Sequence, residues 1–103
     1  MDVDLYVKRG GVYTRAETIP GTTASSDITA KFDALGYVQG YSLTVNASDA
    51  SGFTIAATGG SLTGNVLTIT ETGPVTITVT DKSSDQNTTT ITFTVPDRID
   101  NEP

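Results

Sequence analysis

The side chains of this chain that are best suited to chemistry carry oxygen atoms and lie in polar loops. Asp81, Asp85 and Asn87 fall close together between two strand-like runs, and Asp49 falls in an earlier polar turn. Carboxylate and amide oxygens on a turn are the ligands that Ca²⁺ prefers. Their spacing does not match an EF-hand loop, and Asp and Asn are also ordinary turn residues. We therefore predict no cofactor and keep Ca²⁺ binding as the minor alternative.

The sequence lacks the residue type that most often acts in catalysis. The chain contains no His, which removes the common general base and the common zinc ligand together. Ser residues are abundant, as at Ser25, Ser26, Ser83 and Ser84, but no His is present to activate a hydroxyl group. A pair of carboxylates for glycoside hydrolysis would need a cleft, which a small sandwich rarely offers. The sequence therefore predicts that the protein is not an enzyme.

The best candidates for molecular recognition lie near the N-terminus. Tyr6 and Tyr13 flank a Gly-Gly step, and Lys8 and Arg9 lie between them. Tyr rings pack at strand edges and subunit interfaces while their hydroxyl groups stay in water. Exposed Tyr rings also suit a carbohydrate-binding platform, although the absence of Trp weakens that alternative. We predict that Tyr6, Lys8, Arg9 and Tyr13 contact a protein partner.

The charge of the chain limits the kinds of partner. Six basic and twelve acidic residues give a formal net charge of −6, and no basic cluster is larger than Lys8-Arg9. Such a balance repels nucleic acid and anionic lipid. No segment approaches the ~20 apolar residues that span a bilayer. The N-terminus has neither a basic nor an apolar signal region. We expect no nucleic-acid partner, no membrane association and no export signal.

The last third of the chain alternates Thr with large apolar residues. Residues 75–80 and 90–95 are two period-2 runs, which predict an antiparallel pair with one buried and one solvated face. Shorter runs at 41–45, 53–55, 61–63 and 66–70 are separated by turn residues. The predicted core consists of the inward apolar residues of these runs: Tyr41, Leu43, Val45, Phe53, Ile55, Leu67, Ile69, Val75, Ile77, Val79, Ile91, Phe93 and Val95.

The first 40 residues have a different pattern. Two short runs at 5–9 and 12–15 flank Gly10-Gly11 and predict a tight hairpin. Pro and Gly followed by Ser and Thr predict a loop over residues 16–26. The apolar stripe of Ile28, Phe32 and Leu35 predicts a helix over residues 27–35, started by a cap at Ser26 or Asp27 and ended at Gly36.

Two stretches resemble known families. The segments 72–81 and 88–95 look like the last two strands of a bacterial immunoglobulin-like domain, and residues 60–69 are similar to the middle strands of such domains. The N-terminal stretch Leu5-Tyr6-Val7-Lys8-Arg9-Gly10-Gly11-Val12-Tyr13 resembles the opening strand of tailed-phage virion proteins. The resemblance implies an all-β, immunoglobulin-like antiparallel β-sandwich over residues 41–96. An N-terminal hairpin and one short helix over residues 1–40 would precede it as an anchor, and 97–103 would be a flexible tail.

The same resemblance implies a function. We expect a non-enzymatic structural protein of a phage virion, either a capsid decoration or a tail-associated accessory subunit, made in the host bacterial cytoplasm. Its partners would be other capsid or tail proteins, and a homo-oligomer is left open. Removal of residues 1–15 should then abolish attachment but leave the sandwich folded. The alternatives are a spacer or binding repeat of a bacterial surface adhesin, located at the cell surface, and a carbohydrate-binding module.

Overall fold

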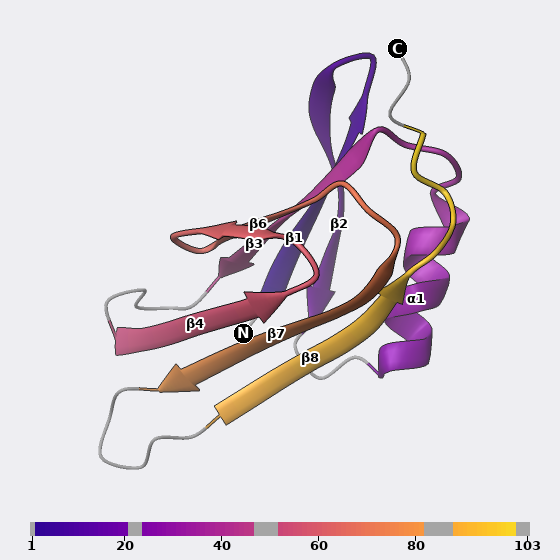
Figure 1. Ribbon diagram of the computed structural model, residues 1–103. Coiled ribbons are helices and arrows are strands. Elements are labelled where there is room, and N and C mark those ends of the chain that lie inside the picture. Colours follow the sequence, from indigo (N-terminus) through magenta and orange to yellow (C-terminus); the bar gives the residue numbers. More distant parts are fainter. Residues whose placement is uncertain (1, 21–23, 47–51, 82–87, 101–103) are drawn as a thin grey trace.

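The computed structural model describes residues 2–20, 24–46, 52–81 and 88–100. Within these residues the strands form two antiparallel sheets, and there is one helix (Figure 1). The predicted Ca²⁺ ligands Asp49, Asp85 and Asn87 lie outside the described residues. In chain order the elements are β1 (Asp2–Arg9), β2 (Val12–Pro20), α1 (Ser25–Ala34), β3 (Gly40–Asn46), β4 (Phe53–Thr58), β5 (Ser61–Thr63), β6 (Val66–Ile69), β7 (Gly73–Asp81) and β8 (Thr88–Val95).

The order of the strands defines the architecture. The larger sheet has the order β2-β1-β3-β6-β5 and the smaller sheet has the order β4-β7-β8. The strands β1-β3-β6-β5 on one sheet and β4-β7-β8 on the other follow the strand order of a constant-type immunoglobulin sandwich. β2 and α1 are inserted between the first two strands of that arrangement. The predicted all-β sandwich with an N-terminal hairpin and one short helix is confirmed.

The N-terminal hairpin forms as predicted, but its second strand is longer than expected. Gly10 and Gly11 both have positive φ, 60° and 79°, as a two-residue hairpin turn requires. β2 continues to Pro20 through a bulge opposite Leu5 and Tyr6, so the predicted loop over residues 16–26 is wrong for residues 16–20. It is also wrong for residues 25–26, which begin α1. Ile19 is buried. Its burial beside β1 outweighs the turn preference of the Pro-Gly pair that follows.

The hairpin is part of the sandwich rather than an appendage to it. β1 pairs with β3 along its length, from Asp2 opposite Asn46 to Lys8 opposite Gly40. The inner face of β1 carries Val3, Leu5 and Val7, all of which are buried in the common core. A hairpin alone is only marginally stable in water, so an apolar face of this kind needs a second layer to cover it. The predicted boundary at residue 40 therefore does not separate two packing units.

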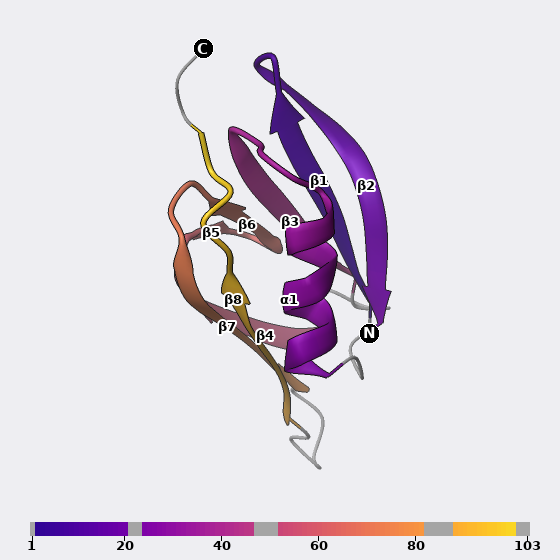
Figure 2. The same ribbon diagram turned by 90° about the vertical axis from the view of Figure 1, so that its right-hand side faces the viewer.

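Helix α1 closes one side of the sandwich. Its buried residues Ile28 and Phe32 face the core, and the Phe32 ring centroid lies 4.7 Å from that of Tyr41 and 4.8 Å from that of Phe93. The backbone N–H of Thr94 on β8 donates to the Thr29 hydroxyl over 3.2 Å. Figure 2 shows α1 running along the side of the sandwich between β2 and β8. The helix therefore covers the edge of the smaller sheet at β8.

The ends of the helix were only partly predicted. α1 starts at Ser25 with Ala24 at the capping position, and no side chain makes a capping hydrogen bond. The expected cap at Ser26 or Asp27 is therefore wrong, because both residues already lie within the first turn. The end is as predicted, since Gly36 has a φ of 72° and follows the last turn in the left-handed conformation. The predicted stripe is present, with Leu35 packed at the margin of the core.

The predicted core is buried with two exceptions, Phe53 and Ile55, which lie on edge strand β4 and are only partly buried. The predicted tail is also bound at its start. Val38 forms a parallel bridge with Ile99, and Ile99 packs against the core. Residues 97–100 are therefore held against the body, whereas residues 101–103 lie outside the described part. The core also gains residues that the predicted set lacked: Val3, Leu5, Val7, Ile19, Ile28, Phe32 and Val38.

Replacing Tyr41 with Phe should stabilise the protein. Tyr41 is fully buried, and among the described residues its hydroxyl group has no hydrogen-bond partner. A buried unsatisfied polar group costs about 1–3 kcal/mol, so Tyr41→Phe should raise the free energy of unfolding by about 1 kcal/mol or more. Urea denaturation measures this change. Tyr37→Phe is the matched control, because Tyr37 is 65% exposed and should leave stability unchanged.

The pH dependence provides a second readout for Tyr41. Burial raises the pKa of Tyr41 above its ordinary value of 10.0. The unfolded chain therefore releases this proton at lower pH than the folded chain, and ionisation weakens the fold above pH 10. The stabilising effect of Tyr41→Phe should grow above that pH. A loss of stability in the variant at pH 7 would mean that the hydroxyl group makes a favourable contact.

Candidate interaction surface

The largest exposed apolar side chains of the described residues lie at one end of the molecule. They are Val12, Tyr13 and Tyr37, which are 62%, 41% and 65% exposed. We call this region the hairpin end, formed by the turn between β1 and β2 (9–12, with Lys8 and Tyr13 beside it), by residues 35–39 and by residues 97–100. Figure 1 shows the hairpin turn and the C-terminal segment together at the top of the view. Three segments that are distant in sequence thus meet at one surface.

Hydrogen bonds attach the hairpin turn to the segment that follows α1. The backbone N–H of Gly11 donates to Oε1 of Gln39 over 2.7 Å, and the N–H of Gln39 donates to the carbonyl oxygen of Lys8 over 2.7 Å. The guanidinium group of Arg9 donates to the carbonyl oxygen of Leu35 just after the helix. These three contacts hold the end of β1 and the turn itself. The hairpin end is therefore held in one arrangement before any partner arrives.

The C-terminal segment completes the surface. The N–H of Val38 donates to the carbonyl oxygen of Arg98 over 2.9 Å, and the N–H of Asp100 donates to that of Val38 over 2.8 Å. The Arg98 guanidinium group lies 3.4 Å from a carboxylate oxygen of Asp33 and 5.5 Å from the centroid of the Tyr37 ring. The exposed Tyr37 ring is thus supported from one side by a cation that is itself paired with α1.

A shallow hollow of about 200 Å³ lies between the three segments. This volume is below the range of about 300–1,000 Å³ that is usual for small-molecule sites. The hollow therefore suits one inserted side chain better than a cofactor or a substrate. Its lining residues come from all three segments: Arg9, Gly10, Tyr37, Val38, Gln39 and Asp100.

Three of the four predicted contact residues lie at the hairpin end. Lys8 and Tyr13 are cross-strand partners, and Nζ of Lys8 lies 5.8 Å from the centroid of the Tyr13 ring. Arg9 lines the hollow, whereas Tyr6 lies farther along β1, opposite Arg15 on β2. The sequence reasoning missed Tyr37, Gln39 and Arg98. The only local signal for these residues is that Tyr37 follows the glycine at the end of the helix.

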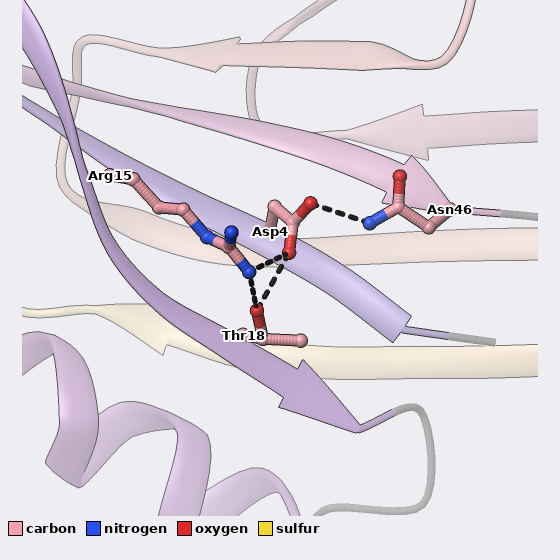
Figure 3. A network of polar contacts seen from close by, with 4 residues as sticks. All are labelled: Asp4, Arg15, Thr18 and Asn46. Carbon is pink, nitrogen blue, oxygen red and sulfur yellow. Dashed lines mark hydrogen bonds and ion pairs between the residues drawn. The ribbon is translucent and has the colours of Figure 1, made fainter.

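A network of polar contacts near the bulge connects β2 with β1 and β3 (Figure 3). The two carboxylate oxygens of Asp4 accept from Nδ2 of Asn46 over 2.6 Å and from the hydroxyl group of Thr18 over 2.8 Å. A guanidinium nitrogen of Arg15 lies 3.2 Å from the oxygen that Thr18 contacts. The network therefore connects β1 with both of its neighbouring strands.

The same contacts set the protonation of Asp4. The hydrogen bonds from Asn46 and Thr18, together with the charge of Arg15, lower the pKa of Asp4 below its ordinary 3.8, although burial opposes the shift. The stability that this network contributes is therefore present above pH 3.8 and is lost as the pH falls through the lower pKa of the folded state. The charged form of Asp4 therefore stabilises the packing of β1 against β2 and β3.

A second, larger hollow has a structural origin. It measures about 570 Å³ and lies where the chain passes from β4 in the smaller sheet to β5 in the larger one. Gly59 and Gly60 make this corner, where a Cβ on Gly59 would lie 2.5 Å from the carbonyl oxygen of Pro74 and one on Gly60 2.5 Å from that of Thr68. The hollow therefore borders a corner where two residues without side chains pass close to β7 of the smaller sheet and to β6 of the larger sheet.

Neither metal ligands nor known relatives assign a function to the chain. Across the described ranges, no group of three or more His, Cys, Asp or Glu residues could hold a metal ion. In the same part of the chain, no helix has the length and apolar character needed to cross a membrane. Comparison with family models, with curated proteins and with solved structures finds no match. The hairpin end is therefore the feature from which a function can be proposed.

Proposed function

We propose that this protein is a non-enzymatic structural subunit of a tailed-phage virion, as a capsid decoration or a tail-associated accessory protein, and that the hairpin end attaches it to a neighbouring protein. The observation that carries the attachment is that Val12, Tyr13 and Tyr37, the exposed large apolar residues of the described part of the chain, lie together at one end of the molecule. The placement in a virion rests on the N-terminal sequence resemblance. The immunoglobulin-type strand order is the kind of scaffold that this resemblance implies.

The chemistry of the hairpin end fits a protein partner. Tyr and Arg are enriched in protein interfaces, and aromatic anchors near a well-packed centre carry much of the binding energy. The surface offers Tyr13 and Tyr37 with Lys8 and Arg98 beside their rings. Because hydrogen bonds already hold the three segments, little conformational entropy is lost on binding. A single side chain of the partner would enter the hollow beside Arg9.

The first half of β2 offers a second mode of contact with the same partner. Among the described strands β2 pairs only with β1, which leaves one backbone edge open. The second half of this edge is shielded by the bulge, by the Lys31–Glu17 ion pair at 2.6 Å and by Pro20. Strand addition by a neighbour would therefore be confined to Val12–Arg15, next to the exposed rings.

Particle incorporation tests this proposal. Virions from a bacterium that produces this chain would be purified, and the chain would be quantified against the major capsid protein by mass spectrometry. The double variant Tyr13→Ser, Tyr37→Ser should lower incorporation by about tenfold or more, because two interface anchors are removed. The matched control is Thr63→Ser on exposed strand β5, which should be incorporated like the parent.

Two results would overturn the proposal separately. Absence of the parent chain from purified particles would exclude a virion protein, whatever the hairpin end does. Equal incorporation of the parent and the double variant would show that attachment uses another surface. The melting temperature of the variant should equal that of the parent, since both Tyr side chains are exposed.

A further inference from the structure

In the described part of the chain, no segment covers the side of the sandwich opposite helix α1 in the way that α1 covers β8. There the smaller sheet ends at β4, whose residues Phe53, Ile55 and Ala57 point toward the core but are only partly buried. Phe53 and Ile55 border an open hollow of about 280 Å³ together with Gly64 and Asn65 from the turn between β5 and β6. The apolar interior is therefore partly accessible along β4.

The hydrogen-bonding direction of the smaller sheet follows from one contact. The N–H of Thr94 on β8 donates to the hydroxyl group of Thr29 on α1, so it points away from β7. The N–H and C=O groups of successive residues point to opposite edges of a strand. Two residues that face each other in an antiparallel pair of strands therefore form either two N–H···O=C hydrogen bonds or none. The opposed residues Phe93 and Val75 therefore form a hydrogen-bonded pair between β8 and β7.

The same alternation identifies the free backbone groups of β4. If Val75 points toward β8, Thr78 points toward β4, where it is opposed to Ala56. Ala56 therefore bonds to β7, and the N–H and C=O groups of Phe53, Ile55 and Ala57 point outward. In the described part of the chain, β4 has no second neighbouring strand that could use them.

This edge lacks the usual protection against strand pairing. Natural edge strands are shielded by charged residues, by Pro, by bulges or by being very short. The second half of β2 is shielded by a bulge and by Pro20, and β5 consists only of Ser61–Thr63. By contrast, β4 has the sequence Phe-Thr-Ile-Ala-Ala-Thr, without charge or Pro, and pairs with β7 in regular register. Among the described residues, none shields β4 from pairing with another strand.

We propose that a second copy of this chain occupies this edge, with β4 pairing antiparallel to β4 of the partner about a twofold axis at Ile55. In this register Ile55 opposes its own counterpart, and Phe53 opposes the small Ala57 of the other copy. All three residues carry the outward backbone groups, so each exchanges both hydrogen bonds with its counterpart. The two smaller sheets then form one continuous sheet across the dimer.

Self-pairing suits this strand for reasons of size and charge. About a twofold axis the bulky Phe53 meets Ala57 at both ends, so the inner face is filled without a clash. Two copies with a net charge of −6 repel each other, and an uncharged strand is where they approach at least cost. The inner side chains of the second copy would also cover the hollow beside Phe53 and Ile55. No residue of the hairpin end lies on β4, so the inference does not depend on the proposed function.

Disulfide trapping tests both the dimer and its register. Thr54 and Ala56 are exposed on the outer face of β4, and in the proposed register Thr54 opposes Ala56 of the other copy. They would form a non-hydrogen-bonded pair with Cα atoms about 4.5 Å apart, which permits a disulfide. Because the chain has no Cys, the variants Thr54→Cys and Ala56→Cys each introduce the only thiol group.

The two variants should behave differently alone and together. Mixed in equal amounts under mild oxidation at about 0.1–1 mM, where a small interface is populated, they should form the heterodimeric disulfide at least fivefold faster than either variant alone. Equal rates in all three samples would mean random collision and would overturn the proposal. Faster self-linking of either variant would overturn the register and the twofold axis at Ile55.

Sedimentation equilibrium of the unlinked protein provides an independent check. The parent should dimerise with rising concentration, whereas Ile55→Lys alone and Ile55→Glu alone should be monomeric, because like charges meet on the axis. An equimolar mixture of the two variants should dimerise again, which loss of folding could not produce. Thr92→Lys on exposed β8 is the control and should dimerise like the parent. A monomeric parent up to 1 mM would overturn the proposal.

Discussion

Replacing Leu5 with Asp is expected to abolish cooperative folding of the whole chain. Leu5 is fully buried and lies on β1, between β2 and β3, opposite Leu43. An Asp at this position would place a carboxylate in an apolar core without a partner, and the penalty of several kcal/mol approaches the entire stability of about 5–15 kcal/mol of a small domain. Circular dichroism during heating, or urea denaturation, should show no folded baseline for this variant.

The neighbouring residue provides the matched control for Leu5→Asp. Tyr6 follows Leu5 on the same strand, but its side chain lies on the opposite face of the sheet and is partly exposed. Tyr6→Asp should therefore retain a cooperative melt at nearly the parent temperature. If Leu5→Asp also melted cooperatively near that temperature, residues 1–40 would be a separate segment, as the sequence had suggested. This comparison replaces deletion of residues 1–15, because that deletion would remove β1 from the core.

The substitution Ile77→Asp should be equally damaging from the other sheet. Ile77 is fully buried on β7, the middle strand of the smaller sheet, between Ala57 on β4 and Ile91 on β8. An unpaired carboxylate there faces the same common core that contains Leu5. We therefore expect Ile77→Asp to remove the folding transition of both sheets together, as followed by tyrosine fluorescence and circular dichroism.

An exposed position on the adjacent strand controls for the charge itself. Thr92 lies on β8 next to Ile91, with its side chain on the solvent face. Thr92→Asp should change the free energy of unfolding by no more than about 0.5 kcal/mol. A cooperative melt of Ile77→Asp near the temperature of the parent would contradict the register of β7. Loss of only part of the transition would show that the two sheets unfold independently.

Local patterns in the sequence were sufficient to predict several of the strands. Successive side chains of a strand point to opposite faces, so the alternation of Thr with Val, Ile and Phe predicted both the pairing of β7 with β8 and the face that each residue buries. Gly10-Gly11 predicted the hairpin for the same kind of reason, because positive φ at two adjacent residues is a local requirement. Three of the four residues predicted to contact a partner, Lys8, Arg9 and Tyr13, lie at the end of that hairpin.

Which elements share a layer depends on contacts between distant segments of the chain. Ile19 lies in a strand because β1 is beside it, and β1 lies in the core because β3 is beside it. Phe53 and Ile55 alternate like the residues of buried strands, but their position at the edge of a sheet leaves them partly exposed. The hairpin end joins Tyr37 and Arg98, which no short-range pattern connects. The periodicity of a strand shows which of its faces is apolar. Which strands become its neighbours depends on the packing that buries the apolar faces of all elements at once.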